Sequence, residues 1–199
     1  MAIIFQLIVF LFSAVIHEVA HGYAALFLGD DTAKRMGRLT LNPIKHLDLF
    51  GSIIMPLLLY LGSAGSFIFG WAKPVPYNPY NLKHPAKDSA LLALAGPGAN
   101  LFLALLFGLT IRFGSSLLPL NILQALSTIV IINLALALFN LIPIPPLDGS
   151  KVLFYFLRNP SLEQTLTRNS WMFLIFIFLL GSKLIAAPLT FLFRLITGL

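Results

Sequence analysis

The chain has 199 residues, of which 58% are hydrophobic and 10% charged, and its mean hydropathy is +0.92. Average soluble domains carry about 25% charged residues, so this composition excludes an ordinary soluble protein and predicts an all-α protein with several membrane spans. The 13 Lys and Arg residues give a net charge of +6, and because they sit in short loops between apolar runs they indicate membrane orientation rather than nucleic-acid binding.

The first apolar run, residues 2–28, carries the motif Ile16-His17-Glu18-Val19-Ala20-His21-Gly22. Two histidines four residues apart share one face of a helix, where both imidazoles can bind one Zn²⁺ while the glutamate reaches the water that the metal activates. An ionisable cluster inside a membrane segment is costly and marks function. We expect this run to be retained as a helix, because it lacks the basic start and the small-residue cleavage site of a signal peptide.

The next part of the chain alternates between polar and apolar character. Residues 30–48 form a polar connector, in which the alternation over residues 38–43 predicts a short strand. Residues 49–72 are uncharged but interrupted by Gly and Pro, so they predict either a full span or a re-entrant element. A proline-rich loop follows at residues 73–79 and cannot be helical.

The second half contains two clear spans and a third apolar stretch. The clear spans cover residues 90–111 and 120–142, and the prolines at 143, 145 and 146 then break the helix just before Leu147-Asp148-Gly149. The last stretch, residues 170–193, contains Lys183, which either snorkels, faces a cavity or marks a shorter span. No repeat is visible, and residues 1–199 are expected to form a single membrane-embedded domain.

A catalytic zinc usually takes three protein ligands, and the chain contains no cysteine. Ala24 and Phe27 occupy the Gly and third His positions of the soluble zincin motif, which excludes that class. Asp148 is the best third ligand, because irregular backbone at membrane depth must line a cavity. An ordinary turn or helix cap explains Asp148 equally well from the local sequence. The other candidates, which we interpret as solvated loop residues, are His46, Asp48, His84 and Asp88.

Charge supplies an independent constraint on the position of Asp148. If residues 49–72 do not cross the membrane, Asp148 returns to the side on which the His17–His21 helix ends. Ten Lys and Arg residues then share that side, with only Arg112 and Arg194 opposite, as the positive-inside rule favours. The ten are Lys34, Arg35, Arg38, Lys45, Lys73, Lys83, Lys87, Lys151, Arg158 and Arg168.

The chain resembles the site-2 protease family of intramembrane zinc metalloproteases, in a compact form without PDZ or CBS domains. The resemblance rests on three motifs in order: the His-Glu-x-x-His segment, Gly96-Pro97-Gly98-Ala99-Asn100, and residues 140–149, which read NLIPIPPLDG. The segment at residues 70–76 also resembles a loop of compact prokaryotic members.

The resemblance implies a three-helix core that binds one Zn²⁺ through His17, His21 and Asp148, with Glu18 as the catalytic base. It places Asn100 and Asn140 near the substrate backbone or the oxyanion. It further implies cleavage of transmembrane segments of other proteins in regulated intramembrane proteolysis, in a prokaryotic inner membrane with the site facing the cytoplasm. Two alternatives stay open, namely a zinc-binding membrane transporter and a non-catalytic relative that acts as a membrane binding module.

Overall fold

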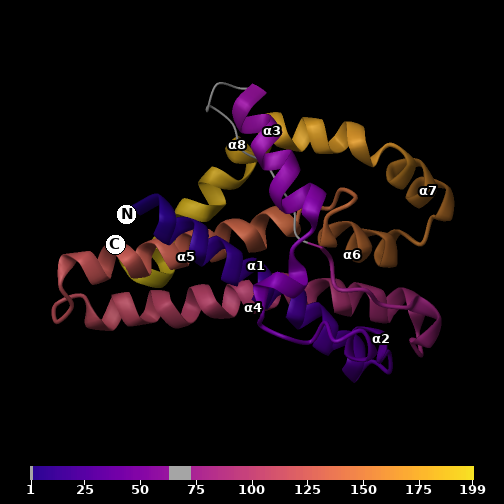
Figure 1. Cartoon of the computed structure of the whole chain (residues 1–199), viewed down its shortest axis with the longest axis horizontal. Coiled ribbons are helices and arrows are strands. Elements are labelled where there is room, and N and C mark those ends of the chain that lie inside the picture. The colour runs from indigo at the N-terminus through magenta and orange to yellow at the C-terminus, as the bar shows by residue number, and fades with distance from the viewer. Residues whose placement is uncertain (1, 63–72) are drawn as a thin grey trace.

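The computed structural model describes residues 2–62 and 73–199, and the structured elements within those ranges are all helical (Figure 1). This confirms the predicted all-α fold. The α-helices are α1 (Ala2–Phe27), α2 (Thr32–Arg35), α3 (Met55–Gly62), α4 (Pro85–Gly114), α5 (Leu120–Asn140), α6 (Asp148–Leu157), α7 (Pro160–Arg168) and α8 (Ser170–Thr197). Two 3₁₀ turns, η1 (Pro43–His46) and η3 (Pro79–Asn81), and one π-helical turn, η2 (Leu49–Ile54), complete the described elements.

Three helices, α1, α4 and α5, are long and apolar enough to cross a membrane. Their mean hydropathies of 2.2, 2.0 and 2.3 agree with the three spans predicted from sequence. Helix α4 begins at Pro85, before the predicted residue 90, because proline suits a first helical position. The Asp88 carboxylate also accepts a hydrogen bond from the His84 backbone N–H at 2.8 Å, so this carboxylate caps the helix. With three helices of this length and hydropathy, the chain is an integral membrane protein with several spans.

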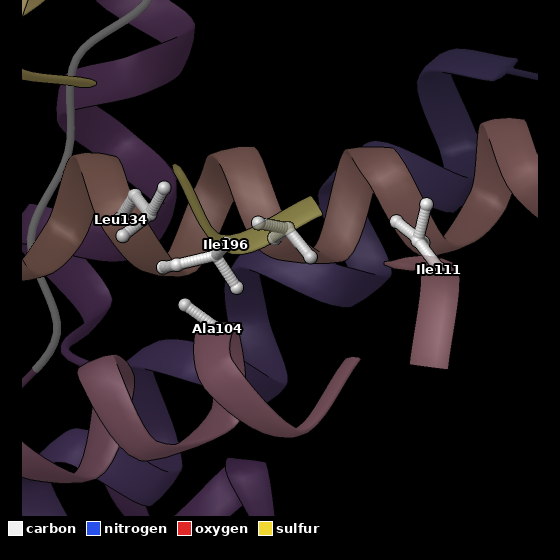
Figure 2. Packing of buried hydrophobic residues seen from close by; sticks show 5 residues of the cluster. Ala104, Ile111, Leu134 and Ile196 are labelled. Atoms are coloured by element: carbon white, nitrogen blue, oxygen red, sulfur yellow. The ribbon is translucent and has the colours of Figure 1, made fainter. Parts of the chain in front are cut away.

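Helix α4 lies at the centre and contacts α1, α5, α6 and α8. The apolar core lies in the half of the bundle that contains the α4–α5 turn, where Figure 2 shows Ile196 of α8 beside Ala104 of α4 and Leu134 of α5. Gly108 allows this approach, because a Cβ atom there would lie 2.4 Å from Ile196 Cγ2. The Arg112 guanidinium donates a hydrogen bond to the Leu195 carbonyl at 2.7 Å. Helix α8 therefore packs against the spans, and the Lys183 side chain lies outside the described residues.

The chain leaves α1 and enters α4 at the same end of the bundle. Asp30, just after α1, accepts hydrogen bonds from the Asn78 backbone N–H and from Asn81 Nδ2, both at 2.7 Å. The two ends of the connector between α1 and α4 therefore lie side by side. Residues 49–62 form η2 and α3, whereas residues 63–72, and with them the expected re-entrant or interfacial path, lie outside the described residues.

Arg112 lies in the last turn of α4 and Arg194 in the last turn of α8, whereas Lys34 and Arg35 lie in the last turn of α2 and Lys45 in that of η1. Figure 1 shows the two termini and the α4–α5 turn together at one end, with α2 and α6 towards the other. Arg112, next to the α4–α5 turn, therefore lies at the end opposite the basic residues of α2, and the side of the membrane for the full set stays a prediction.

The strand predicted over residues 38–43 is wrong, because these residues form no strand in the structure. Asn42 ends the extended stretch by accepting a hydrogen bond from the Ile44 N–H, which starts the 3₁₀ turn η1. The Thr40 carbonyl is bonded to His46 Nε2 at 2.8 Å rather than to a neighbouring strand. Local side-chain bonding by Asn next to Pro therefore outweighs the apolar alternation. The interpretation of His46 and Asp88 as solvated is also wrong, since they are 1% and 5% exposed.

Candidate metal centre

Two residues of α1 and the first residue of α6 meet in a cluster near one end of the bundle. His17 and His21 lie one turn apart on the buried face of α1, with their Nε2 atoms 3.1 Å apart. The Asp148 Oδ2 atom lies 3.2 Å from His17 Nε2 and 3.1 Å from His21 Nε2. Within the described part of the chain, this is the one group of three or more His, Cys, Asp or Glu residues that could hold a metal ion.

The position of Asp148 depends on the glycine that follows it. A Cβ atom at Gly149 would lie 2.2 Å from the Leu141 carbonyl oxygen and 2.7 Å from that of Ile142. The first turn of α6 therefore packs directly on the backbone of the turn that ends α5. A larger residue would push α6 away, and the Asp148 carboxylate would move with it.

The spacing and the surroundings of the three atoms fit a zinc ion. With Zn–N and Zn–O distances of about 2.0–2.1 Å, tetrahedral geometry separates neighbouring ligand atoms by about 3.3 Å. The observed triangle has edges of 3.1–3.2 Å. Gly96 of α4 allows both imidazoles to pack closely against α4, because a Cβ atom there would lie 2.4 Å from His21 Nε2 and 2.5 Å from His17 Nε2. Two imidazoles and a carboxylate also match the ligand types of catalytic zinc sites.

The outer nitrogen of each histidine is held by a hydrogen-bond acceptor. His21 Nδ1 lies 2.7 Å from the Leu92 carbonyl oxygen, which can only accept, so Nδ1 carries the proton. His17 Nδ1 lies 2.6 Å from Asn100 Oδ1. In both rings the Nε2 lone pair is then directed into the cluster, which is the arrangement that metal-binding histidines need.

The electrostatics of Asp148 also suit a ligand. Burial alone would raise the pKa of this carboxyl, but hydrogen bonds and charge from the rings of His17 and His21, when these rings are protonated on Nε2, hold it well below its usual range. The group is therefore ionised at neutral pH, as metal binding requires.

Glu18 lies beside the cluster and is held from outside its own helix. Its Oε2 atom accepts a hydrogen bond of 2.8 Å from the backbone N–H of Val75 in the proline-rich loop. Val75 is 7% exposed and, with Leu39, covers Gly22, where a Cβ atom would lie 2.5 Å from Leu39 Cδ2 and 2.9 Å from Val75 Cγ1. The loop at residues 73–78 thus covers the Glu18 and Gly22 positions of the motif on α1.

The two asparagines named from sequence take different positions. Asn100 bonds His17, and its Nδ2 donates to Asn133 Oδ1 at 2.9 Å and to the Ser13 carbonyl at 3.3 Å, so both polar atoms of its amide have partners within the protein. Asn140 is half-buried at the end of α5, where its Nδ2 donates to the Leu136 carbonyl. Of the other candidate ligands, His46, Asp48, His84 and Asp88 do not join the cluster.

Asn133 and Ser13 were missed by the sequence reasoning, although spacing offered a signal for both. Asn133 precedes Asn140 by seven residues, which is two helical turns, and Ser13 precedes His17 by four. Both therefore share a helix face with a candidate site residue.

Comparisons with known proteins give a consistent picture. The model of the family described as Peptidase family M50 matches residues 110–181, a range that contains Asp148 but not His17 or His21. A Bacillus subtilis (strain 168) protein named "Putative zinc metalloprotease YwhC" is 40% identical over 188 residues, which cover 90% of this chain and 81% of that protein. No solved structure matches the chain.

Proteins named "Putative zinc metalloprotease Rip2" are more distant. The one from Mycolicibacterium smegmatis (strain ATCC 700084 / mc(2)155) is 34% identical over 85% of this chain and 64% of its own length. The one from Mycobacterium tuberculosis (strain ATCC 25618 / H37Rv) is 28% identical over 85% and 63%.

Proposed function

The chain belongs to peptidase family M50, the site-2 protease family, and from this premise we propose that it is an intramembrane zinc endopeptidase of the His-Glu-x-x-His plus Asp type. Its substrates are peptide bonds in or near transmembrane segments of other membrane proteins, cleaved in regulated intramembrane proteolysis. Residues 1–199 act as one membrane-embedded metalloprotease domain. The observation that carries the proposal is the triangle of His17 Nε2, His21 Nε2 and Asp148 Oδ2 near one end of three apolar helices.

His17, His21 and Asp148 hold the zinc ion. The chemistry that zinc supplies in such a site is polarisation of the scissile carbonyl and activation of water at neutral pH. Glu18 follows His17 directly on α1, and its carboxylate accepts the proton of the attacking water and later passes it to the leaving amide nitrogen. The Val75 N–H supports this role, because it holds one oxygen of the carboxylate in place.

Asn140 stabilises the oxyanion in this proposal. It ends α5 at the same end of the bundle as Asp148, and its side chain is half-buried rather than enclosed. An amide N–H aimed at developing negative charge stabilises a transition state by roughly 3 kcal/mol. Asn100 takes another role, because its amide is already bonded to His17, Asn133 and Ser13.

The site faces the cytoplasm in a prokaryotic inner membrane. The supporting observation is the basic character of the loops at its end of the bundle, since positively charged loops remain on the cytoplasmic side. His17 and His21 lie in the second half of α1, so the water that hydrolysis consumes has a short path from that side.

The two alternatives predict different arrangements of polar groups. A transporter needs polar residues along a path through the membrane. Here the candidate ligands converge at one depth, which favours hydrolysis. A non-catalytic binding module would not need Glu18, whose carboxylate is both present and held in place by a backbone N–H.

The test is a pair of variants of the full chain, purified in detergent and assayed for zinc content and for cleavage of a transmembrane reporter substrate. Glu18→Gln keeps an oxygen for the Val75 N–H, and we expect it to retain zinc while cleavage falls by about 10²–10⁴-fold. Asp148→Ala should lose zinc and cleavage together. Cleavage at the wild-type rate by Glu18→Gln would overturn the protease assignment, and zinc uptake by vesicles that contain this variant would favour a transporter.

A further inference from the structure

A chain of buried polar side chains runs from the middle of α5 to the outer nitrogen of His17. Its members are Ser13 of α1, Asn100 of α4 and Asn133 of α5, which are 4%, 0% and 0% exposed. Asn133 Nδ2 donates to the Ile129 carbonyl at 2.9 Å and to Ser13 Oγ at 3.0 Å. Asn133 Oδ1 accepts from Asn100 Nδ2 at 2.9 Å, and Asn100 Oδ1 lies 2.6 Å from His17 Nδ1.

Two backbone carbonyls fix which atom of each asparagine amide donates and which accepts in this series of hydrogen bonds, because a carbonyl can only accept. The Ile129 carbonyl requires the NH₂ group of Asn133 on its side, so Asn133 Oδ1 faces Asn100. The Ser13 carbonyl, 3.3 Å from Asn100 Nδ2, requires the NH₂ group of Asn100 on its side, so Asn100 Oδ1 faces His17. Reversal of either amide would set its oxygen against the backbone carbonyl oxygen on that side, which places acceptor against acceptor in a fully buried site and is costly.

The consequence for His17 is a single tautomer. Because Asn100 presents an oxygen, His17 Nδ1 must carry the proton and Nε2 must carry the lone pair. His21 obtains the same result directly from the Leu92 carbonyl. The tautomer of His21 is thus fixed by a backbone carbonyl, whereas that of His17 is fixed through the side chains of Asn100 and Asn133.

We propose that Asn133 is a positioning residue of the metal centre, which fixes the ring orientation and tautomer of His17 through Asn100. The inference deepens the proposed function and rests on it for zinc as the ion that the cluster holds. Asn133 touches neither metal nor substrate. Its effect is on zinc affinity, because partners of metal-binding histidines change affinity by about 10–100-fold.

A purely structural role for Asn133, bridging α1, α4 and α5, predicts a different pattern. Loss of such a bridge would act independently of Asn100 and would lower stability with or without zinc. If Asn133 instead acts on His17 through Asn100, replacing Asn133 should not change zinc affinity further once Asn100 has been replaced. Variants of contacting residues that act through one path are non-additive in this way.

The experiment measures zinc affinity of the full chain in detergent by competition with a chelator, for Asn133→Leu, Asn100→Leu and the double variant. We expect each single variant to weaken zinc binding by about 10–100-fold. The double variant should be within about twofold of Asn100→Leu alone. The visible spectrum of the Co²⁺-loaded protein should change in both singles, because the His17 ligand is reoriented. If Asn133→Leu does not fold, Asn133→Ala is measured in its place with the same expectation.

The matched control is Thr128→Val on the same helix, where the hydroxyl donates to the Gln124 carbonyl one turn away. It should leave zinc affinity unchanged. Wild-type affinity in the Asn133 variant, or effects of Asn133 and Asn100 that add, would overturn the proposal. Since no readout here uses cleavage, a protein that binds zinc in this pattern but hydrolyses nothing would refute the protease assignment and leave this inference intact.

Discussion

The backbone N–H of Val75 donates a hydrogen bond of 2.8 Å to Glu18 Oε2, although the two residues are 57 positions apart in sequence. The loop that contains Val75 is held by two further contacts on the C-terminal side of Val75. Its Asn78 N–H bonds the Asp30 carboxylate, and the Tyr77 ring lies under Lys151 Nζ at 4.9 Å from the ring centroid. The proposed catalytic base is therefore positioned by a loop that also contacts the helix of Asp148.

Replacement of Val75 by proline removes this N–H and tests its role. A hydrogen bond to a charged group contributes about 1.5–3 kcal/mol, so we expect Val75→Pro to cleave about 10- to 100-fold more slowly with zinc content unchanged. Val75→Ala keeps the N–H and is the matched control, with cleavage close to the wild-type rate. Faster cleavage by Val75→Pro would instead identify the contact as a restraint that substrate must displace.

Gly96→Ala tests whether zinc binding needs the close packing of the His17 and His21 imidazoles against α4. The new methyl would lie 2.4–2.5 Å from both Nε2 atoms, so we expect zinc affinity to fall by roughly 10- to 100-fold, which corresponds to the ~1–3 kcal/mol cost of overpacking. The measurement is zinc retained against a chelator. Gly98→Ala, on the same helix with nothing within 4 Å of its Cβ position, should bind zinc normally. Equal affinity in the two variants would show that the metal is held elsewhere.

Asn140→Ala separates substrate chemistry from metal binding. If its amide donates to the oxyanion, kcat should fall by about 10²–10³-fold while zinc content and KM change little. Asn100→Leu should show the reverse pattern, with weaker zinc binding as the primary defect. A fall in zinc affinity for Asn140→Ala would mean that this side chain supports the Asp148 turn instead of the reaction.

Asp30 makes stability depend on pH in the acid range. Burial alone would raise the pKa of this carboxyl, but hydrogen bonds from Thr32, Asn78 and Asn81 outweigh burial and lower it. Because the pKa is lower in the folded state, the ionised carboxyl stabilises the fold fully at pH values above its unfolded-state pKa of about 3.9. This stabilisation is lost as pH falls towards the folded-state pKa. Asp30→Asn should therefore cost ~2 kcal/mol at pH 7, and its difference from wild type should shrink below about pH 4.

The measurement for Asp30 is the apparent Tm in detergent at several pH values. Asp31→Asn is the control, because Asp31 makes an exposed ion pair with Arg35 at 2.7 Å, and such pairs contribute about 0–1 kcal/mol. It should lower Tm little at pH 7. A constant difference between wild type and Asp30→Asn down to pH 3 would contradict the lowered pKa.

The long helices and the candidate cluster could be predicted because their signals are strong and local. Spans α1, α4 and α5 follow from continuous hydropathy, and the His17–His21 pair follows from helical spacing. Asp148 required two further arguments, the proline break before it and the one-sided distribution of Lys and Arg. Charge patterning worked because the membrane converts loop composition into topology.

The partners of the cluster could not be predicted from sequence, because they depend on which helix faces meet. In the sequence, Asn133 is a single polar residue in an apolar run, and the neighbouring residues do not indicate that it contacts Asn100. The Leu92 carbonyl and the Val75 N–H are backbone groups, which the identity of the residue does not reveal. Gly96 and Gly149 also belong to this class, since their roles depend on the atoms that would collide with a Cβ.

The separation of the three candidate ligands along the chain has a consequence for biosynthesis. His17 and His21, on α1, are synthesised before Asp148, and they form only a two-ligand fragment. Asp148 joins them only after α4 and α5 have been made and paired as a hairpin. The complete three-ligand site cannot assemble until then, so a nascent or wrongly inserted chain lacks the site that hydrolysis requires. Metal acquisition would then mark completion of the topology and keep proteolytic activity from preceding it.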